Sequence, residues 1–138
     1  MADLTALRAP SPAELARTAV AGARVATLAA GRCARPTMVT VVAVVDDADG
    51  QPVIRLERGA PVVPLLSTRP VVRLAMPATY PFSALSLAGR LEDCPSDREQ
   101  CRAFRLSVLG ARLLGTSEVS IPLAEYRSAR PDPLWAGG

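Results

Sequence analysis

The chain has 138 residues, of which 49% are hydrophobic and 21% are charged, and its formal net charge is +3 at pH 7. These values are typical of one globular domain with its own core, and they exclude a mainly disordered chain. The apolar runs are far shorter than the roughly 20 residues of a transmembrane helix, so no membrane partner is expected.

The charged residues and cysteines narrow the possible partners and the compartment. All 16 basic residues are arginines, and they are interleaved with 13 acids rather than gathered into a stripe. Nucleic acid is therefore not an expected partner. The stretch MADLTALRAPSPAE lacks the basic patch and apolar run of a signal peptide, and 3 cysteines are an odd number for a disulfide framework. Both features predict a cytoplasmic location.

The first half of the chain predicts one helix and a series of strands. Ser11 to Glu14 form a capping box, with proline at the first helical position, and they predict a helix up to Arg24. A strand should begin at Val25, followed by a turn at 30–35 and a long central strand at Thr37–Val45. A hairpin turn at 46–52 should return the chain into a strand at Val53–Glu57.

A proline-bearing corner follows this strand, and two further strands should come after it. In Val71–Met76, Arg73 should point away from the face of Val72 and Leu74. A loop at 77–83 leads to the strand Ala84–Glu92, in which Gly89 indicates a bulge or a close approach.

The last part of the chain predicts a second helix and a sixth strand. Ser96 to Glu99 repeat the capping-box arrangement, and the helix that they start should reach about Leu114. Its apolar face should carry Cys101, Phe104, Val108 and Leu109. Glu118–Leu123 should be the sixth strand, and EYRSARPDPLWAGG is not expected to form regular structure.

These elements predict an α+β fold, namely a six-stranded antiparallel β-barrel with two to three flanking helices. A nucleotide-binding βαβ fold is excluded because no strand leads through a glycine-rich turn into a crossover helix. We expect a tail at 1–10, the barrel domain at 11–124 and a proline- and glycine-rich tail at 125–138.

The order of the elements, with ARVATLAA, STRPVVRLAM and SLAGRLEDC at their places, resembles the FMN-binding split-barrel superfamily, the pyridoxamine 5′-phosphate oxidase-like proteins. The resemblance covers roughly residues 12–134 and is nearest to the barrel domain of the heme-utilization branch. It implies a six-stranded split barrel that forms a homodimer, with FMN or heme in two equivalent clefts at the subunit interface.

The family's phosphate-binding groups are replaced in this chain. Flavin-binding members use a basic residue on the long strand and a Ser-Arg-Lys-like set in the corner. Here the corner set falls on Ala60, Pro61 and Val62, which offer no side-chain donor. Nearby groups that do not match the family's pattern could hold the phosphate instead: Thr37, Thr40, Arg55, Arg58, Ser67, Thr68 and Arg69.

A purely structural interpretation of the same residues stays open. Arg55 and Arg73 could be cross-strand partners of acids such as Glu57, and Ser67-Thr68 could simply close a short helix.

Heme is the second cofactor that the resemblance implies. The chain has no histidine, so a thiolate at Cys94-Pro95, or a phenolate at Tyr80 or Tyr126, would have to bind the iron. Cys101 is more simply a small core residue. The cysteine spacing predicts no other metal site.

No catalytic residue can be named, because a serine or cysteine nucleophile needs an adjacent base and no histidine is present. The first hypothesis is therefore an FMN-dependent oxidoreductase or flavin carrier, in which a homodimer borrows redox chemistry from the cofactor. The alternative is a split barrel without a cofactor that works as an interaction or regulatory protein.

Overall fold

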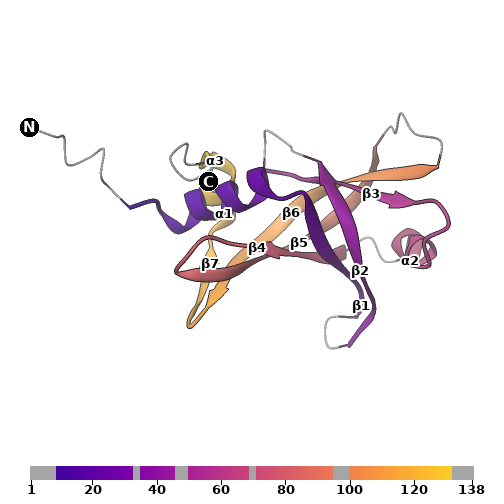
Figure 1. The fold of residues 1–138 in the computed structure, drawn as a ribbon, viewed down its shortest axis with the longest axis horizontal. Helices are drawn as coiled ribbons and strands as arrows, with labels where there is room; N and C mark the ends of the chain where they lie inside the picture. The colour runs from indigo at the N-terminus through magenta and orange to yellow at the C-terminus, as the bar shows by residue number, and fades with distance from the viewer. Residues whose placement is uncertain (1–8, 33–34, 46–49, 69–70, 95–99, 132–138) are drawn as a thin grey trace, which may run out of the picture.

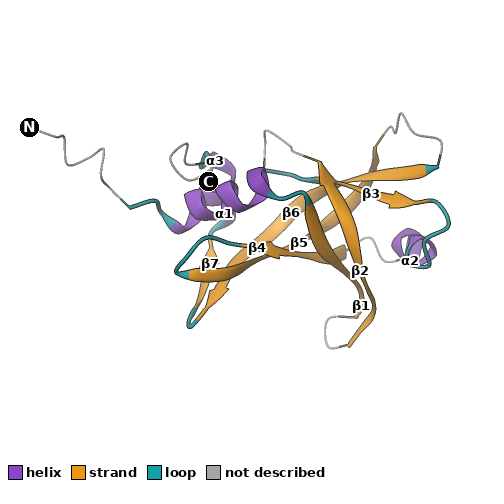
Figure 2. Cartoon of the chain, in the orientation of Figure 1, coloured by secondary structure: helices purple, strands orange, loops and turns teal. Residues whose placement is uncertain are grey.

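A computed structural model of the chain describes residues 9–32, 35–45, 50–68, 71–94 and 100–131 (Figure 1, Figure 2). Seven strands and three helices lie in these ranges. In chain order they are α1 (Pro12–Gly22), β1 (Val25–Arg32), β2 (Arg35–Val45), β3 (Val53–Glu57), α2 (Val63–Thr68), β4 (Val71–Pro77), β5 (Phe82–Cys94), β6 (Cys101–Gly115), β7 (Glu118–Ile121) and α3 (Leu123–Ser128).

The strands form one antiparallel sheet that curls into a barrel. Their order is β3-β2-β1-β4-β5-β6-β7, and an additional pairing between β3 and β6 closes β1 to β6 into a ring. The short strand β7 extends the sheet beyond this ring by pairing with the second half of β6. The predicted α+β fold, a six-stranded antiparallel split barrel with flanking helices, is therefore confirmed.

Helix α1 begins where the capping box predicts. The Ser11 backbone N–H donates to Glu14 Oε1 at 3.1 Å, and the Glu14 N–H donates to Ser11 Oγ at 3.2 Å. Leu15, Ala16 and Val20 are buried on one face of the helix and join the core. The helix thus covers one end of the barrel with its apolar stripe.

Buried and more exposed residues alternate along β3 and β4, and the buried ones form part of the core inside the ring. In β3, Ile54 and Leu56 are buried, whereas Glu57 is exposed. In β4, Val72 and Leu74 are buried and Arg73 is exposed, as the period of two predicts.

Gly89 is the point of close approach that the sequence predicts. The β5–β6 register shifts between Ala88 and Gly89, which marks a bulge. A Cβ atom on Gly89 would collide with the Ser107 carbonyl oxygen of β6. Only glycine fits this contact without displacing the backbone.

The helix predicted up to Leu114 is wrong, because residues 101–115 form the long strand β6. Phe104, Leu106 and Val108 alternate inward, and the register then skips Leu109. After this extra residue, the buried positions are Ala111 and Leu113 instead of even-numbered residues. The apolar residues of β6 therefore include spacings of three and four, which resemble those of a helix. Leu109, expected on an apolar face, is 50% exposed. Residues 96–99 lie outside the described part.

The end of the chain also differs from the expectation. Glu118–Ile121 is the seventh strand rather than the sixth, and Glu125 to Ser128 belong to helix α3. Tyr126 is fully buried, and its hydroxyl donates to the Gly50 carbonyl. Burial of this one aromatic ring fixes a helix in a segment whose composition predicts none.

Helix α3 lies beside α1, as Figure 1 shows. The buried Arg17 guanidinium of α1 donates to the carbonyl oxygens of Tyr126 at 3.1 Å, Arg127 at 3.3 Å and Ala129 at 2.7 Å. These carbonyls stand at the C-terminal end of α3, where a cation is favoured. In the described part of the chain, no helix has both the length and the apolar character needed to cross a bilayer.

Candidate functional site

Two of the predicted cofactor-binding residues, Arg55 and Arg58, lie at or just before the corner between β3 and α2. Arg55 is half-buried on β3, where its strand neighbours are Ala43 of β2 and Ala103 of β6. Arg58 follows β3 directly and is exposed, and its backbone N–H donates to the Gln100 carbonyl at 3.0 Å. The fold therefore holds both arginines next to the beginning of β6.

For the serine and threonine residues of the predicted set, the structure describes the backbone but not the side chains. Thr40 pairs with Leu28 of β1, and Thr37 lies at the irregularity of the β1–β2 register. Ser67 and Thr68 are the last two residues of α2. The side chains of these four residues, and all of Arg69, lie outside the described part, so their roles stay predictions.

The corner itself is built as part of the core. The Ala60 N–H donates to the Glu57 carbonyl at 2.9 Å, and the Val63 N–H donates to the Ala60 carbonyl at 3.0 Å. Val62 is only 1% exposed. The Val62 side chain is therefore packed in the core and cannot contact an anion.

The strand register brings Arg55 close to a thiol. Ala103 of β6 pairs with Arg55 on one side and with Cys94 of β5 on the other. Residues directly opposite one another share a face, so Arg55 and Cys94 stand on the same outer face, about 10 Å apart across two strands. Sequence reasoning missed this arrangement because it placed residue 103 in a helix. The alternation of Phe104, Leu106 and Val108 is the signal that could have revealed it.

A second thiol lies nearby on the same face. Cys101 pairs with Glu57, one step further along β3, and both Cys94 and Cys101 are free and half-buried. The expectation that Cys101 is a core residue of a helix is thus wrong. The surface around Arg55 thus combines arginine side chains with two thiols.

An ion pair lies near the end of the β5–β6 hairpin, on the opposite face of the sheet from Arg55 and Cys94. Arg102 Nη2 lies 2.7 Å from Asp93 Oδ1, and the Arg102 guanidinium lies 4.8 Å from the centroid of the Phe104 ring. Stacking on Phe104 restricts the arginine side chain, which makes this ion pair more rigid than an isolated surface pair.

The alternative interpretation of Arg73 as the cross-strand partner of an acid is wrong. Its neighbours are Ala29 on β1 and Ala88 on β5. Arg55 also stands directly opposite two alanines, but its interpretation as a partner of an acid stays a prediction. On the outer face of the barrel, Arg55 and Arg73 are therefore each flanked by alanines on the neighbouring strands.

Comparisons with solved structures support the same fold. A heme-binding protein from Mycobacterium smegmatis matches 91% of this chain with a TM-score of 0.76 and 24% sequence identity. A protein of unknown function from Agrobacterium tumefaciens matches 91% of the chain with a TM-score of 0.68 and 16% identity. This chain covers 64% of the length of each of these two structures.

A protein of the pyridoxinephosphate oxidase family from Clostridium acetobutylicum, related to general stress protein 26, matches 75% of this chain and 89% of its own. Its TM-score is 0.63 at 12% identity. No protein-family model and no curated protein sequence matches the chain. These structural neighbours, one of which is a member of the pyridoxinephosphate oxidase family, confirm the split-barrel fold that the sequence resemblance implies.

Proposed function

We propose that this chain is a homodimeric split-barrel protein that binds a flat redox cofactor with an anionic side group on the outer face around Arg55. FMN is the first candidate and heme the second. The observation that carries the proposal is the match of 91% of the chain to a heme-binding protein, together with the neighbour from the pyridoxinephosphate oxidase family. With FMN bound, the protein would be an oxidoreductase or a flavin carrier.

The residues around Arg55 fit the anionic end of either cofactor. A guanidinium binds a phosphate or a propionate through two parallel hydrogen bonds. Arg55 is half-buried, which strengthens such a bond relative to one in bulk water, and Arg58 adds a second charge at the rim. Thr37, Thr40, Ser67, Thr68 and Arg69 remain the further candidates. A bound flavin would supply electron transfer, and the chain would supply position and charge.

The residues also restrict how heme could bind. No histidine is available, and Tyr126 already donates its hydroxyl to Gly50 in the interior. The half-buried thiol of Cys94 is the axial-ligand candidate that stands on the same face as Arg55. Tyr80, the other phenolate candidate, is exposed at the opposite end of β5 from Cys94. Heme binding beside Arg55 would therefore require Cys94 as well as the arginine, whereas FMN binding would require only the arginine.

A second candidate function is an interaction module without a cofactor. The burial of Val62 favours it, because the corner that binds phosphate in flavin-binding members is filled by core packing here. Such a protein would act through its dimer surface and would bind neither cofactor.

The test is an equilibrium titration of the purified, cofactor-free protein with FMN and, separately, with hemin, followed by absorbance. One of the two should bind saturably with one cofactor per chain. Arg55→Met should weaken that binding by about tenfold or more, because a charge-assisted hydrogen bond is lost. Arg90→Met, at an exposed arginine of β5, is the matched control and should leave binding unchanged.

Cys94→Ser separates the two cofactors. It should abolish the thiolate-type heme spectrum and leave FMN binding intact. If neither cofactor binds, or if Arg55→Met and Arg90→Met bind alike, the proposal fails and the interaction module is favoured. Sedimentation velocity on the same samples should show a dimer.

A further inference from the structure

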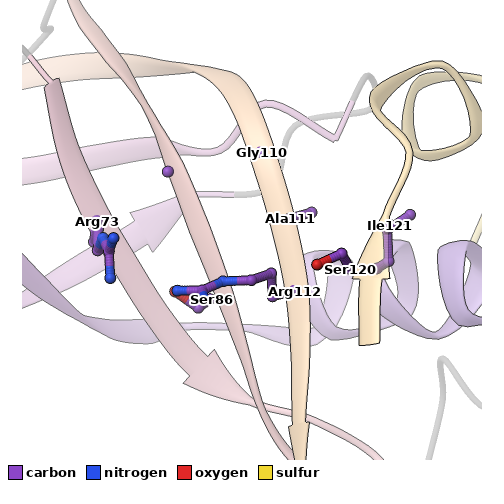
Figure 3. A pocket seen from close by; sticks show the side chains of 8 residues that line it. Arg73, Ser86, Gly110, Ala111, Arg112, Ser120 and Ile121 are labelled. Carbon is purple, nitrogen blue, oxygen red and sulfur yellow. The ribbon is translucent and has the colours of Figure 1, made fainter. Parts of the chain in front are cut away.

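A separate hollow lies on the outer face of the barrel, across β4, β5, β6 and β7. Its volume is about 260 Å³. Figure 3 shows Arg73 on β4, Ser86 on β5, Arg112 on β6 and Ser120 on β7, side by side across the four strands. Four polar side chains from four neighbouring strands therefore line one depression.

The hollow exists because its floor is made of small residues. Ala88 of β5 lies between two strands: it pairs with Gly110 of β6 on one edge and with Arg73 of β4 on the other. Because residues 88 and 110 have no large side chains, the protein surface is recessed between Arg73 and Arg112. This floor is apolar and suits the flat face of a small ring or alkyl group.

The charges at the rim are unequal. Arg112 Nη1 forms an ion pair with Glu118 Oε1 at 2.5 Å, with the two side chains 39% and 50% exposed. Arg73 is exposed, and within the described residues no acid forms an ion pair with it. The hollow thus carries Arg73, which forms no ion pair with a described acid, and Arg112, which is paired with Glu118.

We propose that this hollow is a binding site for a small organic anion, a phosphate or carboxylate attached to a flat apolar body. Arg73 and Arg112 hold the anionic group from two sides, and the Ser86 hydroxyl, between them on β5, donates to it. The apolar body lies on Ala88 and Gly110. The volume is below the roughly 300–1,000 Å³ of pockets for drug-sized ligands, so the site suits a molecule of one ring.

This site is distinct from the cofactor surface proposed above. The hollow reaches β6 at residues 110–112, whereas Arg55 pairs with residue 103 of the same strand. At about 3.3 Å per residue, the two positions are roughly 25 Å apart along β6. Failure of cofactor binding would therefore leave this proposal untouched, and the reverse also holds.

Glu118 regulates the affinity of the hollow through Arg112. Its carboxylate competes with an incoming anion for the same guanidinium, and it repels negative charge nearby. Surface ion pairs of this kind are weak, so an anion that reaches both arginines can displace the carboxylate. Removal of the negative charge on Glu118 should strengthen anion binding.

The test is a titration of the full chain with phenyl phosphate, followed by amide chemical shifts in two-dimensional NMR spectra. The shifts should concentrate on the residues of the hollow. Arg73→Ala should raise the dissociation constant by about tenfold or more, and Glu118→Gln should lower it. Arg90→Ala removes an equal charge from the neighbouring part of β5, outside the hollow, and should change little.

Benzyl alcohol, which has the ring but no anionic group, should not bind at comparable concentrations. The proposal is overturned if the shifts lie elsewhere, if Arg73→Ala and Arg90→Ala weaken binding equally, or if Glu118→Gln leaves the affinity unchanged or reduces it. Unchanged spectra of the variants away from the substituted site show that each remains folded.

Discussion

At the scale of single residues, Arg17 contributes most clearly to the stability of the described structure. It is 4% exposed, its guanidinium donates to three carbonyls at the end of α3, and it lies 5.5 Å from the centroid of the Tyr126 ring. Gly50 adopts φ +74, and the Arg17 side chain occupies the space where a Cβ of residue 50 would lie. One arginine therefore joins α1, α3 and the chain before β3.

Arg17→Met should reduce the free energy of unfolding by about 2–4 kcal/mol, because the carbonyls at the end of α3 lose a charged donor in a buried site. Urea denaturation followed by circular dichroism measures the change. Arg24→Met is the control, since Arg24 is exposed just after α1, and it should be nearly neutral. Equal stability of the two variants would show that the Arg17 contacts are not important.

At the scale of elements, β6 determines how the barrel closes. Its residues 101–105 pair with β3, its residues 111–114 pair with β7, and β5 runs along its other edge. The sequence predicts α1, β3 and β4 well because each has one regular period and a clear boundary. It does not predict β6, because the extra residue at Leu109 changes the period within the strand.

The strand assignment of β6 predicts different effects of substitutions at Leu106 and Leu109, whereas in a helix these two residues would share a face. Leu106 is fully buried and Leu109 is half exposed. Leu106→Asp should therefore leave the chain unfolded, since an unpaired carboxylate would enter the core, whereas Leu109→Asp should fold normally. Thermal melts by circular dichroism measure both. A folded Leu106→Asp, or an unfolded Leu109→Asp, would contradict the register.

The candidate site was predictable only in part, because part of it depends on the pairing of β6 with its neighbours. Residue type and the position of the corner identify Arg55 and Arg58, because cations beside a turn are visible in the sequence. The proximity of Arg55 to Cys94 depends on Ala103 between them, and this pairing across β6 has no local signal. The hollow at Arg73 and Arg112 likewise depends on long-range register.

At the scale of the whole molecule, the ring of six strands leaves the two proposed sites on the outside of the barrel. The interior is filled by apolar side chains such as Leu28, Ile54 and Leu74, which are fully buried. Both proposed sites therefore lie on the outer face, where Arg55 and Arg73 stand opposite alanines. A homodimer would cover part of that face and exclude water from a cofactor held there.

The absorbance spectrum of freshly purified protein, recorded again after incubation with FMN and with hemin, tests the central claim most directly. We predict flavin bands or a heme Soret band that remains with the protein through gel filtration. A protein that is colourless as isolated and stays colourless after both incubations would contradict the account.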